Sequence, residues 1–329
     1  MKVFVTGATG FVGTKLVEEL IKAGYQAHCL VRKTSKLSRL KELGASLCYG
    51  DVTDKESILK GMQDCAWGVN LANLYSYWEP DKKNYTKINI RGTQNVMEAA
   101  LETNLAKIVH VSSIIVYGNN TGDIITEECK MSSEHGSEYA RTKYAGDLTA
   151  WDLYEKNNLP LVVIYPVGII GPGDPKLTGK YLENLIAGKI PSLVFRDATF
   201  TFVHVRDVSL AIIKALEKDH NIGEKYIVGK YQMSYGEYSR LICEIAEVPA
   251  PKNTMSDALT MFLAKIFTVI ANLTKKPPLW DMSTDAVRTL SAGFKADGSK
   301  AEKELGITYT PIHTALEEAV AACREESKI

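Results

Sequence analysis

The sequence predicts an α/β protein, a Rossmann-type doubly wound parallel sheet with a smaller C-terminal lobe. Short apolar runs alternate with amphipathic helical patterns through the first half of the chain, which is typical of β–α–β units with right-handed crossovers. The apolar runs are nearly continuous, as in strands that helices cover on both faces. A length of 329 residues suits one large domain with an additional lobe.

The expected elements follow in chain order. Strands are expected at residues 2–6, 26–31, 46–49, 66–71, 107–111 and 161–165, with helices between them at 11–23, 55–61, 83–102 and 137–157. A loop at 171–175 (GPGDP) ends this rhythm, and shorter elements follow at 200–203, 208–217 and 226–228. We therefore expect one domain over residues 1–170, to which residues 200–230 contribute, and a second lobe over 171–329.

Composition narrows the class of protein. The chain has 39 basic and 39 acidic residues, so it lacks the basic field that attracts nucleic acid, and no nucleic-acid partner is expected. The six cysteines form no C-x-x-C pair and have no histidine at ligand spacing, so we expect free thiols in a reducing compartment and no metal site. The first residues enter a predicted strand directly, so no cleavable signal is expected. The expected location is cytoplasmic.

One apolar stretch, residues 259–273, carries a single charge at Lys265. It is shorter than the roughly 20 residues that span a bilayer, so no transmembrane segment is expected. A buried helix or a subunit contact is the favoured interpretation. A hydrophobic cap over an apolar substrate is the second. Attachment to a membrane surface, helped by Lys275 and Lys276, is the third.

A glycine-rich turn joins the first strand to the first helix and reads TGATGFVG over residues 6–13. Gly7 permits the tight turn, Gly10 lets the backbone approach a pyrophosphate, and Gly13 allows close packing of helix and sheet. The helix N-terminus offers free N–H groups to phosphates. Because a strand and a helix flank the turn, we expect a dinucleotide here. The residues expected to contact it are Gly7, Thr9, Gly10, Phe11, Val12 and Gly13.

The residues after the second strand indicate which dinucleotide. An acidic residue at this place binds the ribose 2′-OH of NAD, whereas this chain has Arg32 and Lys33, with Lys36 shortly after. An arginine here accommodates a 2′-phosphate, so NADP(H) is favoured over NAD(H), with Arg32 and Lys36 as contacts. Simple solvated charges are the alternative. Asp51 and Val52 follow the third strand, where the adenine would lie, although the start of a helix explains Asp51 nearly as well.

A tyrosine and a lysine stand four residues apart in the helical pattern 137–157, at Tyr139 and Lys143, and therefore share one face. A phenol has a pKa of about 10, and a neighbouring ammonium lowers it, so Tyr139 can exchange a proton with a substrate. Ser113 follows the fifth strand, at the ligand-binding edge of the sheet, and can polarise a carbonyl. We expect Ser113, Tyr139 and Lys143 to be catalytic.

Two further features lie near this edge. Asn89 is a mid-helix asparagine and is expected to anchor a water or a backbone group, with a solvated helix face as the alternative. An aromatic cluster follows the fourth strand at Tyr75, Tyr77, Trp78 and Tyr85. It is either ordinary packing or the wall of an apolar substrate pocket, for which Tyr75 and Trp78 are the chosen residues.

These motifs resemble the extended short-chain dehydrogenase/reductase family. The matching segments are TGATGFVG (6–13), GDVTD (50–54), NIRGT (89–93), VSSIIVYG (111–118), YARTK (139–143), GPGD (171–174) and FVHVRDV (202–208). The resemblance implies a Rossmann core with a C-terminal substrate lobe. It also implies catalytic roles for Ser113, Tyr139, Lys143 and Asn89, with Ser112 near the nicotinamide. Residues 31–35, 78–81 and 259–273 resemble the dihydroflavonol-4-reductase and 3β-hydroxysteroid dehydrogenase branch, including hopanoid-associated and farnesol dehydrogenase-like members.

The chain departs from the family pattern at three places. Residues Leu71, Ala72 and Asn73 lack the histidine that often precedes them, and Tyr165, Pro166 and Val167 stand where many members have Arg-Pro. Both triplets are expected to contact the cofactor. Phe200 replaces the arginine that sugar-nucleotide epimerases and dehydratases use, which counts against that branch.

The sequence thus predicts an NADP(H)-dependent oxidoreductase that reduces a ketone or aldehyde of a small hydrophobic substrate, or oxidises the alcohol. A flavanonol, steroid or isoprenoid is the expected substrate class. The alternatives are a sugar-nucleotide epimerase or dehydratase with bound NAD, and a non-catalytic NADP(H) sensor. The sequence leaves the oligomeric state open, and the family resemblance implies a homodimer built on the helices at 83–102 and 137–157.

Overall fold

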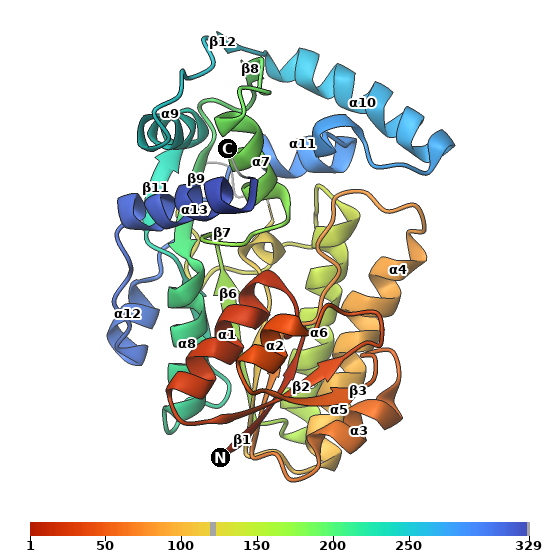
Figure 1. Ribbon diagram of the computed structural model, residues 1–329. Coiled ribbons are helices and arrows are strands. Elements are labelled where there is room, and N and C mark those ends of the chain that lie inside the picture. The colour runs from red at the N-terminus through yellow and green to blue at the C-terminus, as the bar shows by residue number, and fades with distance from the viewer. Residues whose placement is uncertain (119–122, 328–329) are drawn as a thin grey trace.

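The structure, a computed structural model, describes residues 1–118 and 123–327. Its centre is a seven-stranded sheet in the order β10-β6-β5-β4-β1-β2-β3, in which every neighbouring pair is parallel (Figure 1). The strands are β1 (Lys2–Thr6), β2 (Gln26–Val31), β3 (Ser46–Tyr49), β4 (Trp67–Asn70), β5 (Lys107–Val111), β6 (Leu161–Pro166) and β10 (Lys225–Val228). The predicted doubly wound parallel sheet is therefore confirmed. The strand order reverses between β1 and β4, which is where such sheets open a crevice at their carboxyl edge.

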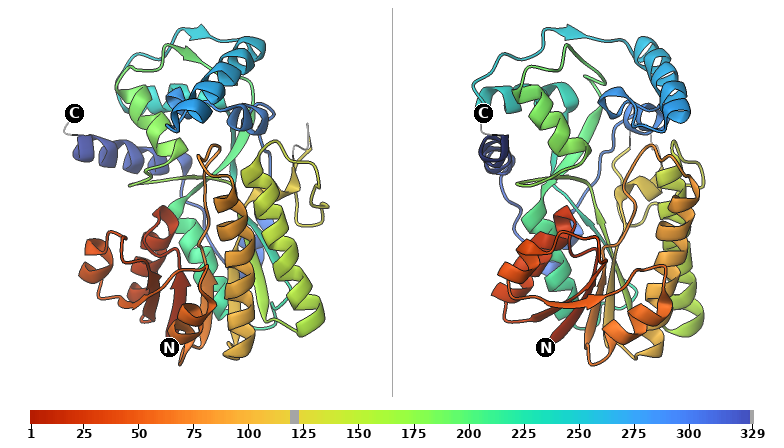
Figure 2. Two further views of the ribbon diagram at one scale, coloured as in Figure 1. Left: turned by 90° about the vertical axis from the view of Figure 1, so that its right-hand side faces the viewer. Right: turned by 45° about the vertical axis from the view of Figure 1, so that its right-hand side comes forward.

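Helices cover both faces of the sheet. α1 (Phe11–Lys22) and α8 (Val205–Glu217) pack together on one face, with the short α2 (Ser38–Glu42) beside α1. α3 (Lys55–Met62), α5 (Thr93–Glu102) and α6 (Glu138–Asn157) cover the other face, where α5 and α6 lie side by side (Figure 2). The short helices α4 (Lys83–Tyr85) and η2 (Ile114–Tyr117) complete this layer. The inner strands are thus buried on both faces, which explains why they are mostly apolar.

The expected helix at 83–102 contains a departure from α geometry. α4 and α5 are joined by a π-helical segment, η1 (Thr86–Gly92), which contacts α6. π segments of this kind occur frequently at functional sites because they displace a side chain from the regular helical register. Hydrophobic periodicity does not distinguish a π turn from an α turn over so few residues, so the sequence did not predict it.

The smaller lobe lies beyond the carboxyl edge of the large sheet (Figure 1). It contains a three-stranded sheet of β11 (Tyr231–Ser234), β9 (Thr199–His204) and β7 (Gly168–Ile170), and a pair of short strands, β8 (Ser192–Leu193) and β12 (Asn253–Thr254). Its helical elements are α7 (Leu177–Ile186), α9 (Tyr235–Ile245), α10 (Asp257–Thr274), η3 (Leu279–Asp281), α11 (Thr284–Leu290) and α13 (Ile312–Ser327). α12 (Ser299–Leu305) returns to the large sheet and packs on β10 and α8.

α10 contradicts the favoured interpretation of residues 259–273 as a buried helix. The helix forms as expected, but only 17% of it is buried within the chain. It is capped by Ser256, whose hydroxyl accepts a hydrogen bond from the backbone N–H of Leu259. By length and composition it is the one helix, within the part of the chain that the structure describes, that could cross a membrane.

Candidate active site

The glycine turn between β1 and α1 has the geometry of an anion cradle. Gly7 adopts a left-handed backbone (φ 69°), and a Cβ on Gly13 would lie 2.2 Å from the Gly7 carbonyl oxygen, so both positions require glycine. Gly10 is the N-cap of α1 and supplies no side-chain cap, so no N-cap side chain takes up the first N–H groups of the helix. Thr9 and Gly10 are exposed, with Phe11 and Val12 half-buried beside them. This arrangement fits a pyrophosphate.

Residues 71–73 lie against the glycine turn at the point where the strand order reverses. The Thr6 hydroxyl donates to Asn70 Oδ1 (2.7 Å) and accepts from the Ala72 N–H (3.1 Å), which fixes the chain leaving β4. A Cβ added to Gly7 would lie 2.7 Å from the backbone carbonyl carbon of Leu71, so the two segments are in close contact. Leu71 is buried and Asn73 exposed, so this segment lies at the carboxyl edge of the sheet beside the glycine turn, and its contact with a cofactor stays a prediction.

The residues expected at the adenosine half lie at the ends of β2 and β3. Arg32, Lys33 and Lys36 are exposed, and none forms an ion pair within the described residues. The Asp51 carboxylate accepts hydrogen bonds from both the N–H and the hydroxyl of Thr53 (2.9 and 2.8 Å). These bonds support the interpretation of Asp51 as part of the turn before α3, and its contact with an adenine stays a prediction. Val52 is buried, leaving a preformed apolar wall.

Ser113 and Tyr139 meet at the carboxyl end of β5. Ser113 caps η2, where its hydroxyl accepts from the Ile115 N–H (3.4 Å). Its side chain lies beside the Tyr139 phenol and opposes the rise in the pKa of that phenol. The Ser112 hydroxyl next to it is buried and has no hydrogen-bond partner within the described residues. Buried hydroxyls without a partner are rare, so this atom fits a polar group of a bound ligand. The dinucleotide therefore suits both the turn and the end of β5.

Tyr139 and Lys143 lie one turn apart on the buried face of α6, as predicted. The Lys143 ammonium is 3% exposed and donates to the Val111 carbonyl (3.2 Å). The Tyr139 ring packs against Tyr75 and Tyr77, with ring centroids 5.2 and 5.8 Å away. Burial raises the pKa of the Tyr139 phenol well above its ordinary value, and Tyr75 adds to the increase. The predicted lowering by Lys143 is therefore wrong for this structure, because desolvation of the phenolate dominates.

A buried polar chain behind Lys143 was not predicted. Asp147 is fully buried one turn after Lys143, and its carboxylate lies 3.1 Å from His110 Nε2. The other ring nitrogen of His110 lies 3.2 Å from the Asn70 amide. Burial lowers the pKa of Lys143, and the Asp147 charge opposes that decrease. Burial likewise lowers the pKa of His110. An acid four residues after Lys143, on the buried face of α6, was the available signal in the sequence.

Asn89 is a buried anchor between two segments of the site. Its side-chain oxygen accepts from the Leu74 N–H (2.7 Å), and its amide donates to the Thr142 hydroxyl (3.1 Å). Asn89 therefore ties the loop after β4 to α6, beside Tyr139 and Lys143. It meets the expectation of a backbone anchor, and the alternative of a solvated helix face is wrong, since the residue is 2% exposed.

Two expected residues lie elsewhere. Trp78 does not reach Tyr139, because its indole N–H donates to Asn272 on α10 (3.0 Å) and Tyr77 occupies the place beside the phenol instead. The Tyr165 side chain is fully buried and accepts a hydrogen bond from the Trp151 indole (3.2 Å). Its ring thus belongs to the core. Pro166 and Val167 are also buried, so this triplet offers a ligand mainly its backbone.

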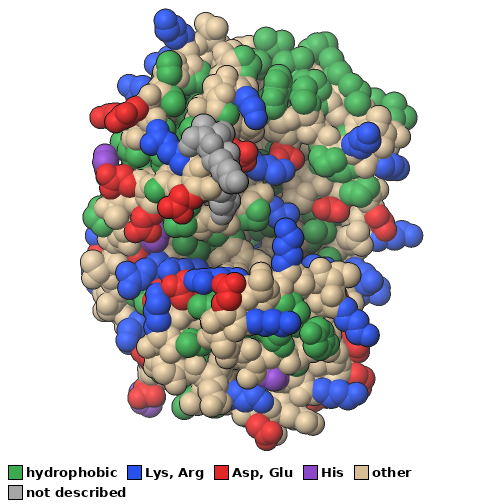
Figure 3. Space-filling model, in the orientation of Figure 1, with side chains coloured by type: hydrophobic (Ala, Val, Ile, Leu, Met, Phe, Trp, Pro, Cys, Tyr) green, Lys and Arg blue, Asp and Glu red, His purple; other side chains and the backbone are tan. Residues whose placement is uncertain are grey.

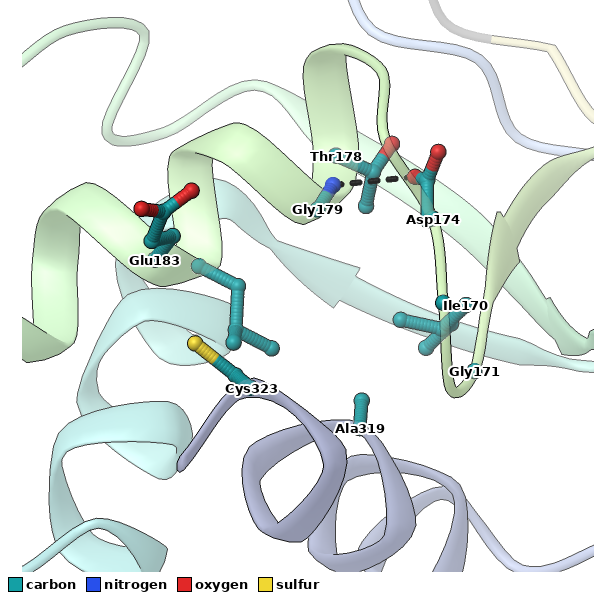
Figure 4. A pocket seen from close by; sticks show the side chains of 10 residues that line it. Ile170, Gly171, Asp174, Thr178, Gly179, Glu183, Ala319 and Cys323 are labelled. Atoms are coloured by element: carbon teal, nitrogen blue, oxygen red, sulfur yellow. Dashed lines mark hydrogen bonds between the residues drawn. The ribbon is translucent and has the colours of Figure 1, made fainter. Parts of the chain in front are cut away.

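A cavity of about 60 Å³ lies between the loop after β7, α7 and α13 (Figure 4). The Asp174 carboxylate at its edge accepts from the N–H groups of Lys176 and Gly179 (2.9 Å each), so it caps the start of α7. Asp207 is similarly engaged by Thr310. Both acids therefore have structural partners within the fold. Residues 1–118 and 123–327 contain no group of three metal-ligating side chains.

Comparison with known proteins places this site in a family. A model of the NAD dependent epimerase/dehydratase family matches residues 3–229. A protein of Synechocystis sp., provisionally named dihydroflavonol 4-reductase, is 29% identical and covers 96% of this chain and 93% of its own length. Sterol demethylase protein B of Methylococcus capsulatus is 27% identical, and the match covers 100% of both.

Solved structures share the whole fold. The crystal structure of gox2253 is 30% identical, covers 99% of each chain and superposes with a TM-score of 0.86. A UDP-glucuronic acid 4-epimerase from Bacillus cereus, solved with UDP-glucuronic acid and NAD, has a TM-score of 0.80 at 23% identity and covers 99% of this chain and 100% of its own. At that identity the second likeness shows the fold alone.

Proposed function

Because the chain belongs to the NAD dependent epimerase/dehydratase family, we propose that it is an NADP(H)-dependent reductase of a ketone or aldehyde on an apolar substrate. The observation that carries the proposal is the position of Tyr139, which lies beside Ser113 and is covered by Tyr75 and Tyr77. A proton donor, a carbonyl-polarising hydroxyl and an apolar wall converge at one point. This combination suits the reduction of a carbonyl that is attached to an apolar group.

Each residue has a distinct role in this proposal. When bound on the glycine turn, the dinucleotide supplies the hydride. Ser113 donates a hydrogen bond to the carbonyl oxygen, and Tyr139 gives that oxygen a proton as charge develops on it. Lys143, held by the Val111 carbonyl, supplies positive charge beneath the site. Tyr75 and Tyr77 exclude water and pack against the apolar part of the substrate.

The reductase assignment is preferred over an epimerase because of the residues around Phe200. Its ring packs against Phe202, Tyr235 and Phe294, at centroid distances of 6.3, 5.8 and 6.3 Å. An aromatic cluster at this place offers no charge to a nucleoside diphosphate, which needs cationic partners. Relatives of both kinds match the chain, for example cinnamoyl-CoA reductase 2 of Medicago truncatula and UDP-glucose 4-epimerase of Drosophila melanogaster, so the site chemistry decides the proposal.

The preference for NADP(H) is proposed from Arg32, with Lys36 in support. Arg32 is exposed and unpaired at the end of β2, and a guanidinium binds a phosphate with two parallel hydrogen bonds. Exchanging Arg32→Glu should weaken NADPH binding by roughly 100-fold while NADH binding changes much less. Equal effects on both dinucleotides would argue against this role.

The direct test is consumption of NADPH with a panel of flavanonols, steroid ketones, isoprenoid aldehydes and small aldehydes, with NADH in parallel. We expect turnover with an apolar member, faster with NADPH. Tyr139→Phe should lower kcat by at least about 100-fold, the usual contribution of a positioned acid, without changing the Kd for NADPH. Retained turnover in Tyr139→Phe would refute the mechanism. Binding of UDP- or dTDP-sugars without reduction of any carbonyl would favour the epimerase.

A further inference from the structure

The helix α10 exposes six of its large apolar side chains to solvent, whereas the positions that it buries fully are small. The outward residues, which we call the α10 face, are Leu259, Phe262, Ile266, Val269, Ile270 and Leu273, and each is between 39% and 79% exposed. The buried positions are Thr260, Ala264 and Ala271. A surface helix of a globular protein has the opposite arrangement. Figure 3 shows the resulting gathering of hydrophobic side chains at the upper right, over α10.

Both ends of α10 are attached to the same lobe. Before it, β12 pairs with β8. After it, the chain turns back into α11, and the Thr268 hydroxyl accepts from the Thr284 N–H (2.9 Å). Figures 1 and 2 show the helix running along the outer edge of the lobe. A helix that is held along the surface in this way can bind a bilayer only by lying in the plane of the interface, with its solvent-exposed side toward the acyl chains.

Most charges around the α10 face are positive, and the exposed acid on the helix itself is Asp257 in the first turn. Lys265, Lys275 and Lys276 are exposed, and none forms an ion pair within the described residues. Asp281 nearby is already paired with Lys180 (2.9 Å). Next to the helix end, Leu279 and Trp280 are 54% and 47% exposed, and they extend the apolar surface. Tryptophan and lysine at the border of an apolar stripe are typical of helices that lie at a membrane interface.

We propose that the α10 face docks on the surface of a bilayer that contains anionic lipid. The apolar stripe enters the boundary between headgroups and acyl chains, and the three lysines neutralise lipid phosphates. A second copy of the chain fits less well. If α10 packed antiparallel against α10 of a second copy about a two-fold axis, each residue near the middle of the helix would lie opposite the same residue of the other copy. Lys265 would then lie opposite the like charge of the second Lys265.

The catalytic residues are connected to this face. The indole N–H of Trp78 donates to Asn272 of α10 (3.0 Å), and the Tyr77 carbonyl accepts from Ser283, just before α11 (2.8 Å). Tyr77 in turn packs on Tyr139. Residues 75–78 therefore connect the Tyr139 phenol with the α10 face. The identity of the substrate rests on the proposed function. It is a lipophilic carbonyl compound that partitions into the bilayer and reaches Tyr139 past residues 75–78.

Vesicle sedimentation tests the docking. The full chain is mixed with vesicles of phosphatidylcholine, or of phosphatidylcholine with about one-third phosphatidylglycerol, and the bound fraction is measured. We expect binding to the anionic vesicles that falls in about 1 M salt, where charges are screened. Lys275→Ala combined with Lys276→Ala should remove most of the preference for anionic lipid.

A matched pair of variants tests the apolar contribution. Ile270 on the α10 face and Ile222 in a remote loop are 50% and 49% exposed, so each can be replaced by serine without disturbing the core. Ile270→Ser should lower the vesicle partition coefficient by roughly three- to ten-fold, whereas Ile222→Ser should bind as the parent chain does. Equal binding by the two variants, or no binding by the parent, would overturn the proposal. So would a dimer in lipid-free buffer that Ile270→Ser converts to a monomer.

The docking and the proposed function can fail separately. Reduction of a water-soluble carbonyl compound in lipid-free buffer depends on Tyr139 and should be the same in Ile270→Ser as in the parent. Turnover without vesicle binding would overturn the docking alone. Vesicle binding by a chain that reduces none of the carbonyl compounds would overturn the proposed function alone.

Discussion

Substituting two glycines of the turn should separate folding from cofactor binding. A Cβ on Gly13 would lie 2.2 Å from the Gly7 carbonyl oxygen and 2.8 Å from Ala8 Cα, both backbone atoms. A Cβ on Gly10 would meet one atom, the Gly7 oxygen, at 3.2 Å. Gly10 also has an ordinary backbone conformation (φ −82°, ψ 175°) that alanine adopts readily. The same added methyl group therefore has different consequences at the two positions.

The magnitudes follow from these contacts. In Gly13→Ala, α1 must move away from β1 by about 1 Å, and overpacking of this kind costs about 1–3 kcal/mol. The gain in helix propensity, about 1 kcal/mol, offsets only part of that cost. In Gly10→Ala the fold should change by less than about 0.5 kcal/mol. Its methyl group, however, stands where the pyrophosphate would approach the backbone, so NADPH affinity should fall by roughly 10- to 100-fold.

Urea denaturation gives the free energy of unfolding for both variants, and titration of NADPH fluorescence gives the dissociation constants. We expect Gly13→Ala to be destabilised and Gly10→Ala to have the stability of the parent with weaker NADPH binding. Parent-like NADPH affinity in Gly10→Ala would refute the placement of the pyrophosphate at this turn. A fully stable Gly13→Ala would show that α1 adjusts without strain.

Three further predictions concern buried polar groups. Asp147→Asn leaves the buried Lys143 cation without its counter-charge and should lower the free energy of unfolding by about 2–4 kcal/mol and reduce kcat; an unchanged urea midpoint would contradict this. Lys107 is 8% exposed and donates to the Ala215 and Leu216 carbonyls (3.1 Å each) at the end of α8. Lys107→Met should therefore lower the free energy of unfolding by about 2–3 kcal/mol, and Lys214→Met, at an exposed position of α8, serves as the control. Burial raises the Tyr139 pKa above the usual value of about 10, so the phenol keeps its proton as pH increases. The kcat/KM for reduction should therefore stay level to about pH 9, whereas the rate of oxidation, which needs the phenolate, should increase with pH. A reduction rate that already falls near neutral pH would show that another group is the proton donor.

Short segments of the sequence were sufficient to predict the sheet and the glycine turn that follows its first strand. β1, β2, β3 and β5 have the predicted bounds. For β1 and β5 the reason is that strands buried on both faces are mostly apolar. The spacing of Tyr139 and Lys143 was sufficient to place them on one helical face, since i and i+4 positions coincide in any α-helix. The roles of the glycines at 7, 10 and 13 could be predicted from the strand and the helix that flank them. These are properties of short segments, which depend on nearest neighbours along the chain.

What the tertiary structure decided depends on segments far apart in the chain. Asp147, His110 and Asn70 become one polar chain only because α6 packs over β5 and β4, and Tyr77 rather than Trp78 covers Tyr139 because Asn272 holds the indole on α10. The direction of the Tyr139 pKa shift follows the same rule, since burial is a property of the packed molecule. Residues 259–273 are the clearest case. Hydropathy identifies an apolar helix, but whether its large side chains face a core or the solvent is set by which other elements remain to cover them, and in this fold they remain exposed.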